Sequence, residues 1–271
     1  MTAARLGSVG DPGAADGLQG RRRSMVQEQL VARGIGDPAV LAAMEAVPRH
    51  RFVPPAMERH AYADGALAIG FGQTISQPYI VALMTELLRL DAGSRLLEIG
   101  TGSGYQAAVA ARIAAEVWSV ERMEELSRRA AAVLAAIGVH NVHLVLGDGS
   151  RGLPEQAPFD AVIVTAAAES VPSALLDQLA DGGRLVVPVG PVGHTQILTV
   201  FTRHGADFQV REDIPCRFVP LIEGSAPPST AGAGDTGPAP SSWGADEGDD
   251  PRQTEGPRGS GSDDGSRGSA A

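Results

Sequence analysis

The residues with the clearest chemical meaning form a glycine-rich turn that follows an acidic residue. Glu98 stands just before this turn, in the run EIGTGSGY, and a helical pattern opens at Tyr105. Glycine lets the backbone turn tightly and approach a ligand with no Cβ in the way. Because such turns also join strands to helices without binding anything, the glycines alone leave a structural role open. The candidate cofactor-binding residues of the turn are Gly100, Thr101, Gly102, Ser103 and Gly104.

Two further acidic residues stand where the next apolar segments end. Glu121 closes the segment after the turn, and Asp148 lies between Gly147 and Gly149 after the following one. In a doubly wound parallel sheet, ligands bind beyond the carboxyl ends of the strands, so these positions should share one edge. An acid at position 121 can accept both ribose hydroxyls of a nucleoside. Residues 147–149 can face its adenine amine through a carboxylate or through the backbone.

The spacing of the glycines distinguishes between nucleoside cofactors. A dinucleotide-binding turn needs glycine at its first, third and sixth positions, and the sixth position here is Tyr105. A pyrophosphate also favours an exposed helix N-terminus, whereas the acid Glu98 suits a cofactor that carries positive charge. S-adenosylmethionine carries a sulfonium and an ammonium group. The turn and its three acids resemble class I S-adenosylmethionine-dependent methyltransferases, and NAD binding stays open as an alternative.

A second segment, GQTISQP at residues 72–78, precedes the turn and contains Ser76. As a nucleophile Ser76 would need a partner base, and none of the six histidines lies in a recognisable triad arrangement. Its hydroxyl fits better as a hydrogen-bond donor to a substrate carboxylate, a contact that contributes on the order of 1.5–3 kcal/mol. Because Pro78 begins a predicted helix, a plain N-cap role for Ser76 stays open as well.

Ordered blocks of sequence surround these two segments from about residue 25 to residue 224. They are VPRHRFVP at 47–54, IGFGQTISQP at 69–78, LLEIGTGSGYQAA at 96–108, GDGSRG at 147–152, FDAVIVTAAAESVP at 159–172, GGRLVVPVG at 182–190 and RFVPL at 217–221. Together they resemble the protein-L-isoaspartate O-methyltransferase family. Ala68 departs from the family pattern, in which many members have proline, and this should loosen the approach to Ser76 slightly.

The resemblance implies a repair enzyme, EC 2.1.1.77, that methylates the free α-carboxylate of L-isoaspartyl residues in damaged proteins and peptides. S-adenosylmethionine is the implied cofactor, and the methyl ester then closes to a succinimide that returns part of the residue to aspartyl. Ser76 is implied as the catalytic residue. Thr74, Ser76 and the main chain around Val219 are implied to hold the peptide in an extended form, although ordinary packing around Val219 remains an alternative.

Two other functions share part of these features. A class I methyltransferase acting on RNA or a small molecule would share EIGTGSGY but has no reason to carry GQTISQP. Methylation of an isoaspartyl peptide, compared with its aspartyl twin, tests for that alternative. A non-catalytic binding module would keep the fold without the acids, yet Glu98, Glu121 and Asp148 are all present. Calorimetry of cofactor binding tests for the second alternative.

Short apolar segments alternate with helical patterns from residue 95 onward, and they predict the elements that position these residues. Such segments indicate a parallel sheet covered on both faces. We predict an α/β fold with a doubly wound, mostly parallel Rossmann-like methyltransferase sheet and an N-terminal helical extension. The predicted strands are 95–99, 117–121, 142–146, 161–164 and 184–189. The predicted helices are 25–33, one that begins after Asp37 at Pro38, one from Pro78, and 105–114, 124–136 and 171–179.

Composition sets the predicted domain boundaries. Residues 225–271 are rich in Gly, Pro, Ser and Asp and have no apolar periodicity, which predicts a disordered acidic tail. Residues 1–20 are predicted to be disordered for the same reason, so the methyltransferase domain spans residues 21–224. Met25 stays open as an alternative start of the chain.

Charge and cysteine content limit the expected partners and compartment. The formal net charge of −10 argues against a nucleic-acid partner. No apolar run is long enough to span a bilayer, and a single cysteine, Cys216, fits a reducing compartment. We therefore expect a cytoplasmic protein, a monomer, with no membrane partner. No cluster of cysteine and histidine has the spacing of a zinc site, so we expect no metal.

Overall fold

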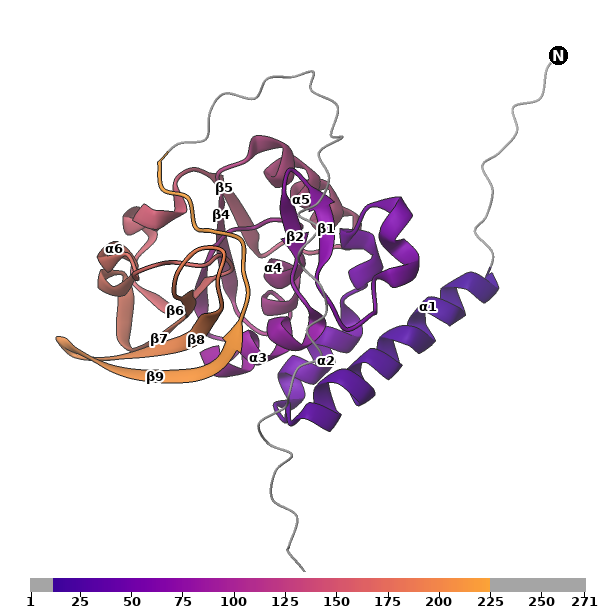
Figure 1. The fold of residues 1–271 in the computed structure, drawn as a ribbon, viewed down its shortest axis with the longest axis horizontal. Coiled ribbons are helices and arrows are strands. Elements are labelled where there is room, and N and C mark those ends of the chain that lie inside the picture. The colour runs from indigo at the N-terminus through magenta and orange to yellow at the C-terminus, as the bar shows by residue number, and fades with distance from the viewer. Residues whose placement is uncertain (1–11, 225–271) are drawn as a thin grey trace, which may run out of the picture. The chain divides into compact units, whose positions relative to one another are not determined.

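A seven-stranded sheet forms the centre of residues 12–224, the part of the chain that the computed structural model describes. Its strands are β3 Arg95–Ile99, β4 Glu116–Glu121, β5 Val142–Leu146, β6 Phe159–Val164, β7 Leu179–Val189, β8 Gln196–His204 and β9 Asp207–Cys216. They lie in the order β5-β4-β3-β6-β7-β8-β9 (Figure 1). Neighbours from β5 to β7 pair in parallel, and β8 and β9 add antiparallel pairs. The predicted doubly wound, mostly parallel α/β fold is confirmed.

Helices and turns connect the strands. The α-helices are α1 Pro12–Ser24, α2 Pro38–Ala46, α3 Pro78–Leu88, α4 Tyr105–Ala110, α5 Glu124–Ala136 and α6 Ser173–Asp177. The shorter helical turns are Met25–Leu30, Val31–Arg33, Arg49–Phe52, Pro55–His60, Gly149–Arg151 and Pro154–Gln156. An antiparallel hairpin, β1 Leu67–Gly70 and β2 Gln73–Ile75, lies just before α3.

The predicted helices differ from the observed ones mainly at their ends. Helix α5 has the predicted bounds, and Asp37 caps α2 as expected, because its side chain accepts hydrogen bonds from the N–H groups of Ala39 and Val40. Helix α4 is shorter than predicted and ends at Ala110. Helix α6 is also shorter, because Leu179 already belongs to β7.

Alternate residues of the central strands pack into two cores, one on each face of the sheet. Leu96 and Ile163 belong to the larger core, which includes apolar residues of α2, α3, α4 and α5. Leu97 and Val162 belong to the other core, together with Leu175 of α6. Since successive side chains of a strand point to opposite faces, such strands are apolar on both sides and need cover on both.

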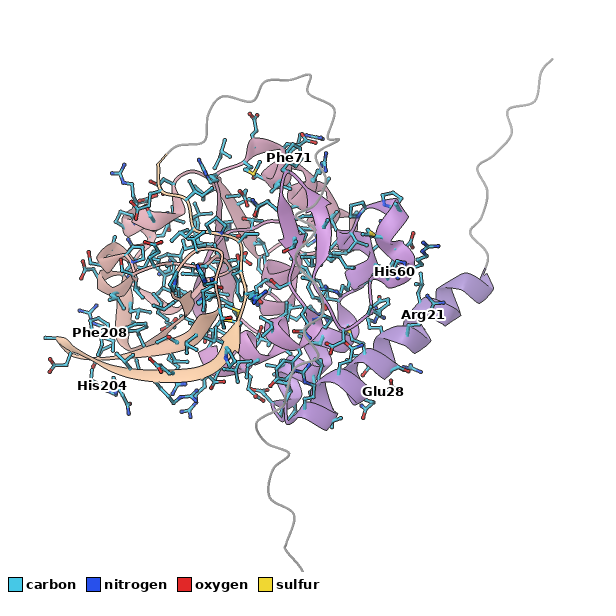
Figure 2. The ribbon with its side chains drawn as sticks, viewed as in Figure 1. Arg21, Glu28, His60, Phe71, His204 and Phe208 are labelled. Atoms are coloured by element: carbon cyan, nitrogen blue, oxygen red, sulfur yellow. The ribbon has the colours of Figure 1, made fainter. Side chains whose placement is uncertain are left out.

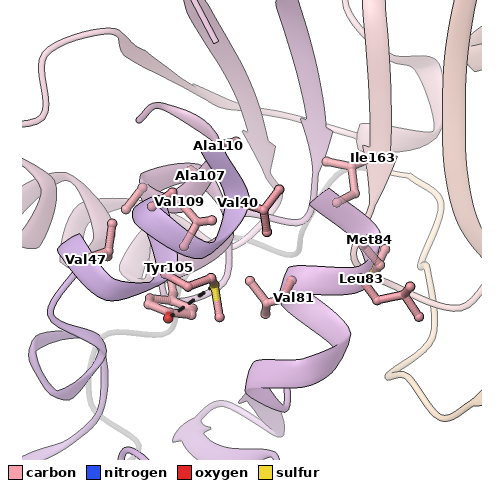
Figure 3. Close-up of a cluster of buried hydrophobic side chains, with 14 of the residues drawn as sticks. Val40, Val47, Val81, Leu83, Met84, Tyr105, Ala107, Val109, Ala110 and Ile163 are labelled. Carbon is pink, nitrogen blue, oxygen red and sulfur yellow. Dashed lines mark hydrogen bonds between the residues drawn. The ribbon is translucent and has the colours of Figure 1, made fainter. Parts of the chain in front are cut away.

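The larger core brings the cofactor turn close to the N-terminal helices. Figure 3 shows Val40 of α2, Val81 of α3 and Tyr105 of α4 around one cluster of buried side chains. The Tyr105 hydroxyl donates to the Met44 sulfur at 3.7 Å. Tyr105 directly follows the glycine-rich turn, so its burial fixes the start of α4 against the rest of the domain.

The N-terminal extension differs from the prediction. Residues 12–20 belong to helix α1, whereas their composition predicts disorder over residues 1–20. Leu18 packs against the larger core, and the Arg21 guanidinium donates to the Arg59 carbonyl at 3.2 Å. These contacts supply the burial that the composition alone does not reveal. Residues 1–11 and the predicted acidic tail, 225–271, lie outside the described residues.

The antiparallel strands β8 and β9 are absent from the sequence prediction. Most side chains of β9 are at least partly exposed, and charged residues such as Arg211 and Asp213 interrupt any alternation of apolar residues. Strand formation here depends on pairing with β8, a context that local sequence does not carry. Figure 2 labels His204 and Phe208, which flank the turn between the two strands.

Candidate active site

A cavity of about 790 Å³ lies at the carboxyl ends of β3, β4 and β6, beside the β1–β2 hairpin. This volume falls within the range of about 300–1,000 Å³ that is common for small-molecule sites. Most predicted site residues line it, namely Thr74, Ser76, Gly100, Thr101, Gly102, Ser103, Glu121, Gly147, Gly149 and Val219. Glu98, Gly104 and Asp148 are not part of its lining.

The glycine-rich turn has the left-handed backbone that its sequence suggests. Gly100, Gly102 and Gly104 have φ values of 96°, 53° and 85°. A Cβ on Gly100 would lie 2.5 Å from the Thr165 hydroxyl oxygen, which itself donates to the Gly100 carbonyl at 2.6 Å. A Cβ on Gly104 would lie 3.0 Å from the Ala130 Cβ of α5. Gly104 thus permits the close packing of α4 on α5, and Gly100 permits the close approach of Thr165.

Glu121 joins the turn to the end of β4. Its two carboxylate oxygens accept hydrogen bonds from the N–H groups of Gly102 and Met123, each at 2.9 Å. The residue is 6% exposed and lines the cavity. Since each carboxylate oxygen has two lone pairs, Glu121 can still accept hydrogen bonds from a ligand's hydroxyl groups.

Glu98 is fully buried and reaches the turn only through other side chains. The Ser119 hydroxyl donates to Glu98 Oε2, and Ser119 and Thr101 are linked by a hydroxyl contact of 2.6 Å. Glu98 Oε1 has no hydrogen-bond partner among the described residues. Burial raises the pKa of Glu98 to about 8; the Ser119 hydrogen bond opposes this and the nearby Glu121 charge adds to it. The carboxyl group is therefore mostly protonated near neutral pH.

The Asp148 carboxylate points to the protein's own backbone. One oxygen accepts from the N–H and hydroxyl of Ser150, at 3.0 and 2.7 Å, and the other accepts from the Gly224 N–H at 2.7 Å. The flanking residues Gly147 and Gly149 line the cavity, and a Cβ on Gly149 would clash with Ile99. At this edge of the cavity the structure therefore presents backbone, one of the two possibilities that the sequence leaves open.

Ser76 lies between β2 and α3 and lines the same cavity as the glycine-rich turn. The N-cap of α3 is Gln77, so the plain N-cap role considered for Ser76 is wrong. The Ser76 carbonyl accepts from Arg49 Nη2 at 2.7 Å, and the Gln77 side chain donates to Asp64 at 2.8 Å. Its hydroxyl makes no hydrogen bond within the described residues and lines the cavity.

Two other segments complete the Ser76 side of the cavity. Thr74 pairs with Ala68 in the hairpin. The Val219 carbonyl accepts from the Ala167 N–H at 2.8 Å, so the chain after β9 runs beside the end of β6. The Phe218 N–H donates to the buried Gln196 side chain at 3.0 Å. Together these contacts hold extended backbone at the cavity edge.

Three apolar residues at the cavity are missing from the sequence prediction. Phe71, Leu146 and Ile222 are 36%, 54% and 47% exposed, and all three line the cavity. Phe71 lies at the tip of the hairpin (Figure 2), and the Arg129 guanidinium lies 5.0 Å from its ring centre. Single apolar residues give no periodic signal. In the sequence, only their positions next to Gly72, Gly147 and Leu221 indicate that they lie at the cavity.

Residues 12–224, the part of the chain that the structure describes, contain neither a cluster suited to a metal ion nor a membrane-spanning helix. No group of three or more His, Cys, Asp or Glu side chains is arranged to hold a metal ion. No helix within residues 12–224 combines the length and apolar character needed to cross a membrane.

Comparison with known proteins gives consistent matches over the folded residues. The family model for protein-L-isoaspartate(D-aspartate) O-methyltransferase matches residues 21–226. A protein-L-isoaspartate O-methyltransferase from Opitutus terrae is 57% identical over 200 residues, which cover 74% of this chain and 86% of the relative. One from Picosynechococcus is 54% identical over 207 residues, which cover 76% of this chain and 92% of the relative.

Solved structures give the same match. A structure described as a protein-L-isoaspartate O-methyltransferase superposes with a TM-score of 0.67 and 31% identity, over 73% of this chain and 65% of that one. A Plasmodium falciparum structure, described as a protein of the same kind in complex with S-adenosyl-L-homocysteine, gives a TM-score of 0.65 and 26% identity, over 75% and 99% of the two chains.

Proposed function

This chain belongs to the protein-L-isoaspartate(D-aspartate) O-methyltransferase family, and from this premise we propose how its cavity carries out the family's reaction. The protein transfers a methyl group from S-adenosylmethionine to the α-carboxylate of L-isoaspartyl residues in damaged proteins and peptides. The backbone amide nitrogen that follows then attacks the ester carbonyl and displaces methanol, which gives a succinimide, and hydrolysis of the succinimide returns part of the residue to aspartyl. The relatives give no support to RNA or a small molecule as the substrate.

The reaction asks the protein for alignment more than for proton transfer. A carboxylic acid titrates near pH 4, so the substrate carboxylate is already ionised at neutral pH and needs no base. S-adenosylmethionine, when bound, supplies a methyl group on a positively charged sulfur. Holding two reactants in line can supply roughly 7–11 kcal/mol, and excluding water favours steps in which opposite charges cancel. The residues of this chain are therefore expected to orient the carboxylate and keep the site dry.

The residues around the glycine-rich turn fit the cofactor. Gly100 and Gly102 line the cavity without a side chain, the Glu121 carboxylate has lone pairs left for ribose hydroxyls, and the Glu98 carboxyl group is buried behind the turn. We assign cofactor binding to Gly100, Thr101, Gly102, Ser103, Glu121, Gly147 and Gly149, with Glu98, Gly104 and Asp148 supporting them from outside the cavity. A positive group near Glu98 would favour its ionised form.

The assignment of the substrate site depends on one observation, which concerns the Ser76 hydroxyl. It lines the same cavity as the turn, and it makes no hydrogen bond of its own within the described residues. A hydroxyl in this state can donate to the substrate carboxylate, and a hydrogen bond to a charged group contributes on the order of 1.5–3 kcal/mol. Ser76 is thus the proposed catalytic residue, acting by orientation.

Thr74 and the main chain at Val219 are proposed to hold the peptide. Selectivity over normal aspartate must come from the peptide backbone, because both residues carry a carboxylate and differ by one methylene in the main chain. Extended backbone at Val219 offers main-chain hydrogen bonds of the kind that a strand edge offers to a peptide. Peptides with many different flanking side chains should therefore be methylated.

A comparison of three proteins tests this proposal: the unaltered chain, Ser76→Ala and the control Ser173→Ala. Ser173 is an exposed serine at the start of α6 and does not line the cavity. We expect Ser76→Ala to lower kcat/KM for an isoaspartyl peptide roughly 10- to 100-fold, with S-adenosylmethionine affinity unchanged by calorimetry. Ser173→Ala should match the unaltered chain. Unchanged turnover in Ser76→Ala would remove Ser76 from the site.

We further propose that the protein acts as a cytoplasmic monomer without a nucleic-acid partner. Its net charge of −10 would repel phosphate groups. Its one cysteine, Cys216, is buried, and burial raises the pKa of the thiol to about 12, so the thiol is poorly reactive. Light scattering at several protein concentrations tests the oligomeric state, and cell fractionation tests the compartment.

A further inference from the structure

We propose that Arg49 is a positioning residue for the methyl transfer, which orients the Ser76 hydroxyl by holding the Ser76 carbonyl. This inference rests on the proposed role of Ser76. Arg49 belongs to the turn Arg49–Phe52, outside the cavity lining, and its side chain is fully buried. Neither the glycine-rich turn nor the GQTISQP segment contains it.

The Arg49 guanidinium links two loops through their main chains. Its Nε donates to the Ala61 carbonyl at 2.7 Å, and its Nη2 donates to the Ser76 carbonyl at 2.7 Å. Both bonds come from one planar group, so the two carbonyls are held in a fixed relation to each other. A shift of the Ser76 peptide group would break a hydrogen bond to a buried charge.

Fixing this carbonyl matters because the Ser76 hydroxyl has no other anchor. It makes no hydrogen bond within the described residues, and the side chain of Ser76 does not cap α3. The main chain fixes the position of the Ser76 Cβ, so only rotation about χ1 remains to direct the hydroxyl. The Arg49 side chain donates to the Ser76 carbonyl, and the Gln77 side chain donates to the Asp64 carboxylate. These two hydrogen bonds hold this stretch of chain.

The same guanidinium also lies against the cofactor side. Its carbon is 4.9 Å from the ring centre of Tyr105, which follows the glycine-rich turn and lines the cavity. A cation over an aromatic ring is stabilised electrostatically. Arg49 thus lies between the Ser76 carbonyl and the ring of the first residue of α4.

Stability alone does not account for an arginine here. Arg49 Nη1 has no hydrogen-bond partner among the described residues. A buried charge with unused donors costs free energy, and apolar residues of similar volume often serve stability as well or better. Burial lowers the pKa of Arg49 to about 10, which still leaves it charged at neutral pH. The positive charge of Arg49 therefore lies close to Ser76, the residue proposed to bind the substrate carboxylate.

A double-mutant cycle tests the inference, with Arg49→Met, Ser76→Ala and the combined variant assayed on an isoaspartyl peptide. Arg49→Met should lower kcat/KM on the order of 10- to 100-fold, with unchanged S-adenosylmethionine affinity by calorimetry. If Arg49 acts through Ser76, its replacement should have little further effect in the Ser76→Ala background. Arg49→Lys keeps the charge but not the forked geometry, so it should restore only part of the activity.

Arg203→Met is the matched control, because Arg203 also donates to main-chain carbonyls, those of Leu179 and Asp177, away from the cavity. It should lower the melting temperature without changing kcat/KM. Multiplicative effects of Arg49→Met and Ser76→Ala would overturn the inference while leaving Ser76 in place. An unchanged kcat/KM in Ser76→Ala alone would instead remove Ser76 from the site, and with it the proposed role on which this inference rests. Loss of the fold in both Arg49→Met and Arg49→Lys would also overturn the inference, since the arginine would then serve the whole domain.

Discussion

On the cofactor side of the cavity three adjacent parallel strands end together, whereas the substrate side is assembled from segments far apart in the sequence. The glycine-rich turn follows β3, Glu121 is the last residue of β4, and Gly147 follows β5, all within residues 95–149. The substrate side needs the hairpin end at Ser76 and the chain around Val219, which are held by Arg49 and by Gln196.

The two sides owe their geometry to different kinds of contact. The cofactor side is fixed by backbone conformation and by packing between neighbouring strands. The substrate side is fixed by single buried side chains that clamp carbonyl and N–H groups across long stretches of sequence. Changes on the first side should therefore affect cofactor affinity and stability together. Changes on the second should affect the peptide and leave the cofactor alone.

The largest effect is expected from Gly100→Ala on the cofactor side. Gly100 has a φ of 96°, and a Cβ there would lie 2.5 Å from the Thr165 hydroxyl oxygen. Strain and overpacking together should lower the free energy of unfolding by about 2–5 kcal/mol. The turn must also shift, so S-adenosylmethionine affinity should fall steeply. Urea unfolding and calorimetry measure the two effects.

Gly138→Ala is the control for Gly100→Ala. Gly138 has a φ of 72°, and nothing lies within 4 Å of the position that a Cβ would take there. Gly138→Ala should lower the free energy of unfolding only by the cost of an alanine with left-handed backbone, about 1 kcal/mol. Its cofactor affinity should be unchanged. Equal losses in both variants would show that the contact with Thr165 does not constrain the turn.

A second effect on the cofactor side concerns pH and Glu98. Its folded pKa of about 8 lies above the ordinary value of 4.5, because the carboxyl group is buried. The folded state therefore binds the proton more tightly, so the stability linked to this group is greatest below pH 4.5 and is lost as the pH rises through 8. Glu98→Gln cannot ionise. Between about pH 5 and 9, the free energy of unfolding of Glu98→Gln should therefore increase relative to that of the unaltered chain.

Glu125→Gln is the control for this pH dependence. Hydrogen bonds from Arg128 and Arg129 lower the pKa of the exposed Glu125 to about 2. The stability linked to Glu125 is present above its ordinary pKa and is lost only in acid, so its replacement should give a constant difference from about pH 5 to 9. A constant difference for Glu98→Gln as well would mean that Glu98 is ionised throughout this range.

The comparison also explains what could be predicted from the sequence. Strands β3 and β5 and helix α5 have the predicted bounds, because apolar runs and caps are local signals. The glycine-rich turn can be found for the same reason. Strand β9 and the helical residues before Gly20 depend on tertiary contacts that no window of sequence contains.

The candidate site divides in the same way. The sequence points to Ser76 and Glu121, both of which line the cavity. It cannot reveal that the Glu98 carboxyl is buried and linked through Ser119, or that the Asp148 carboxylate turns to Gly224. Arg49 stands in the block VPRHRFVP, but its role cannot be read there, since its partners are main-chain carbonyls at residues 61 and 76, which no motif records.

On the substrate side, Gln196→Leu should weaken peptide binding. The buried Gln196 carboxamide accepts from the Phe218 N–H at 3.0 Å and donates to the carbonyls of Pro191 and His194. Without it, the chain around Val219 loses its anchor and buried groups lose partners, a cost of about 1–3 kcal/mol. The KM for an isoaspartyl peptide should rise roughly 10-fold, with S-adenosylmethionine affinity unchanged.

Gln178→Leu is the matched control, because Gln178 is also a buried carboxamide that clamps main chain. It accepts from the Leu153 N–H at 2.7 Å and donates to the Arg151 carbonyl at 2.8 Å, away from Val219. It should lower stability by a similar amount and leave the peptide KM unchanged. A rise in KM for both variants would trace the effect to general loosening of the domain.

The smallest effect is expected where the two sides meet, at Phe71. This residue lies at the hairpin tip that leads to Thr74, and the Arg129 guanidinium of α5 lies 5.0 Å from its ring centre. Phe71→Leu keeps an apolar side chain and removes the cation–ring contact, which is worth about 0.5–1 kcal/mol at an exposed site.

Because Phe71 lines the cavity, lies beside Arg129 of α5 and belongs to the turn that leads to Thr74, its replacement should alter both affinities slightly. We expect roughly two- to fivefold weaker binding of S-adenosylmethionine, by calorimetry, and a similar rise in peptide KM, as about 0.5–1 kcal/mol implies. Val210→Ala, at an exposed residue of β9 outside the cavity lining, should change neither. A change in only the S-adenosylmethionine affinity or only the peptide KM would assign the hairpin tip to that side alone. The cofactor and substrate sides would then be separate even at the tip.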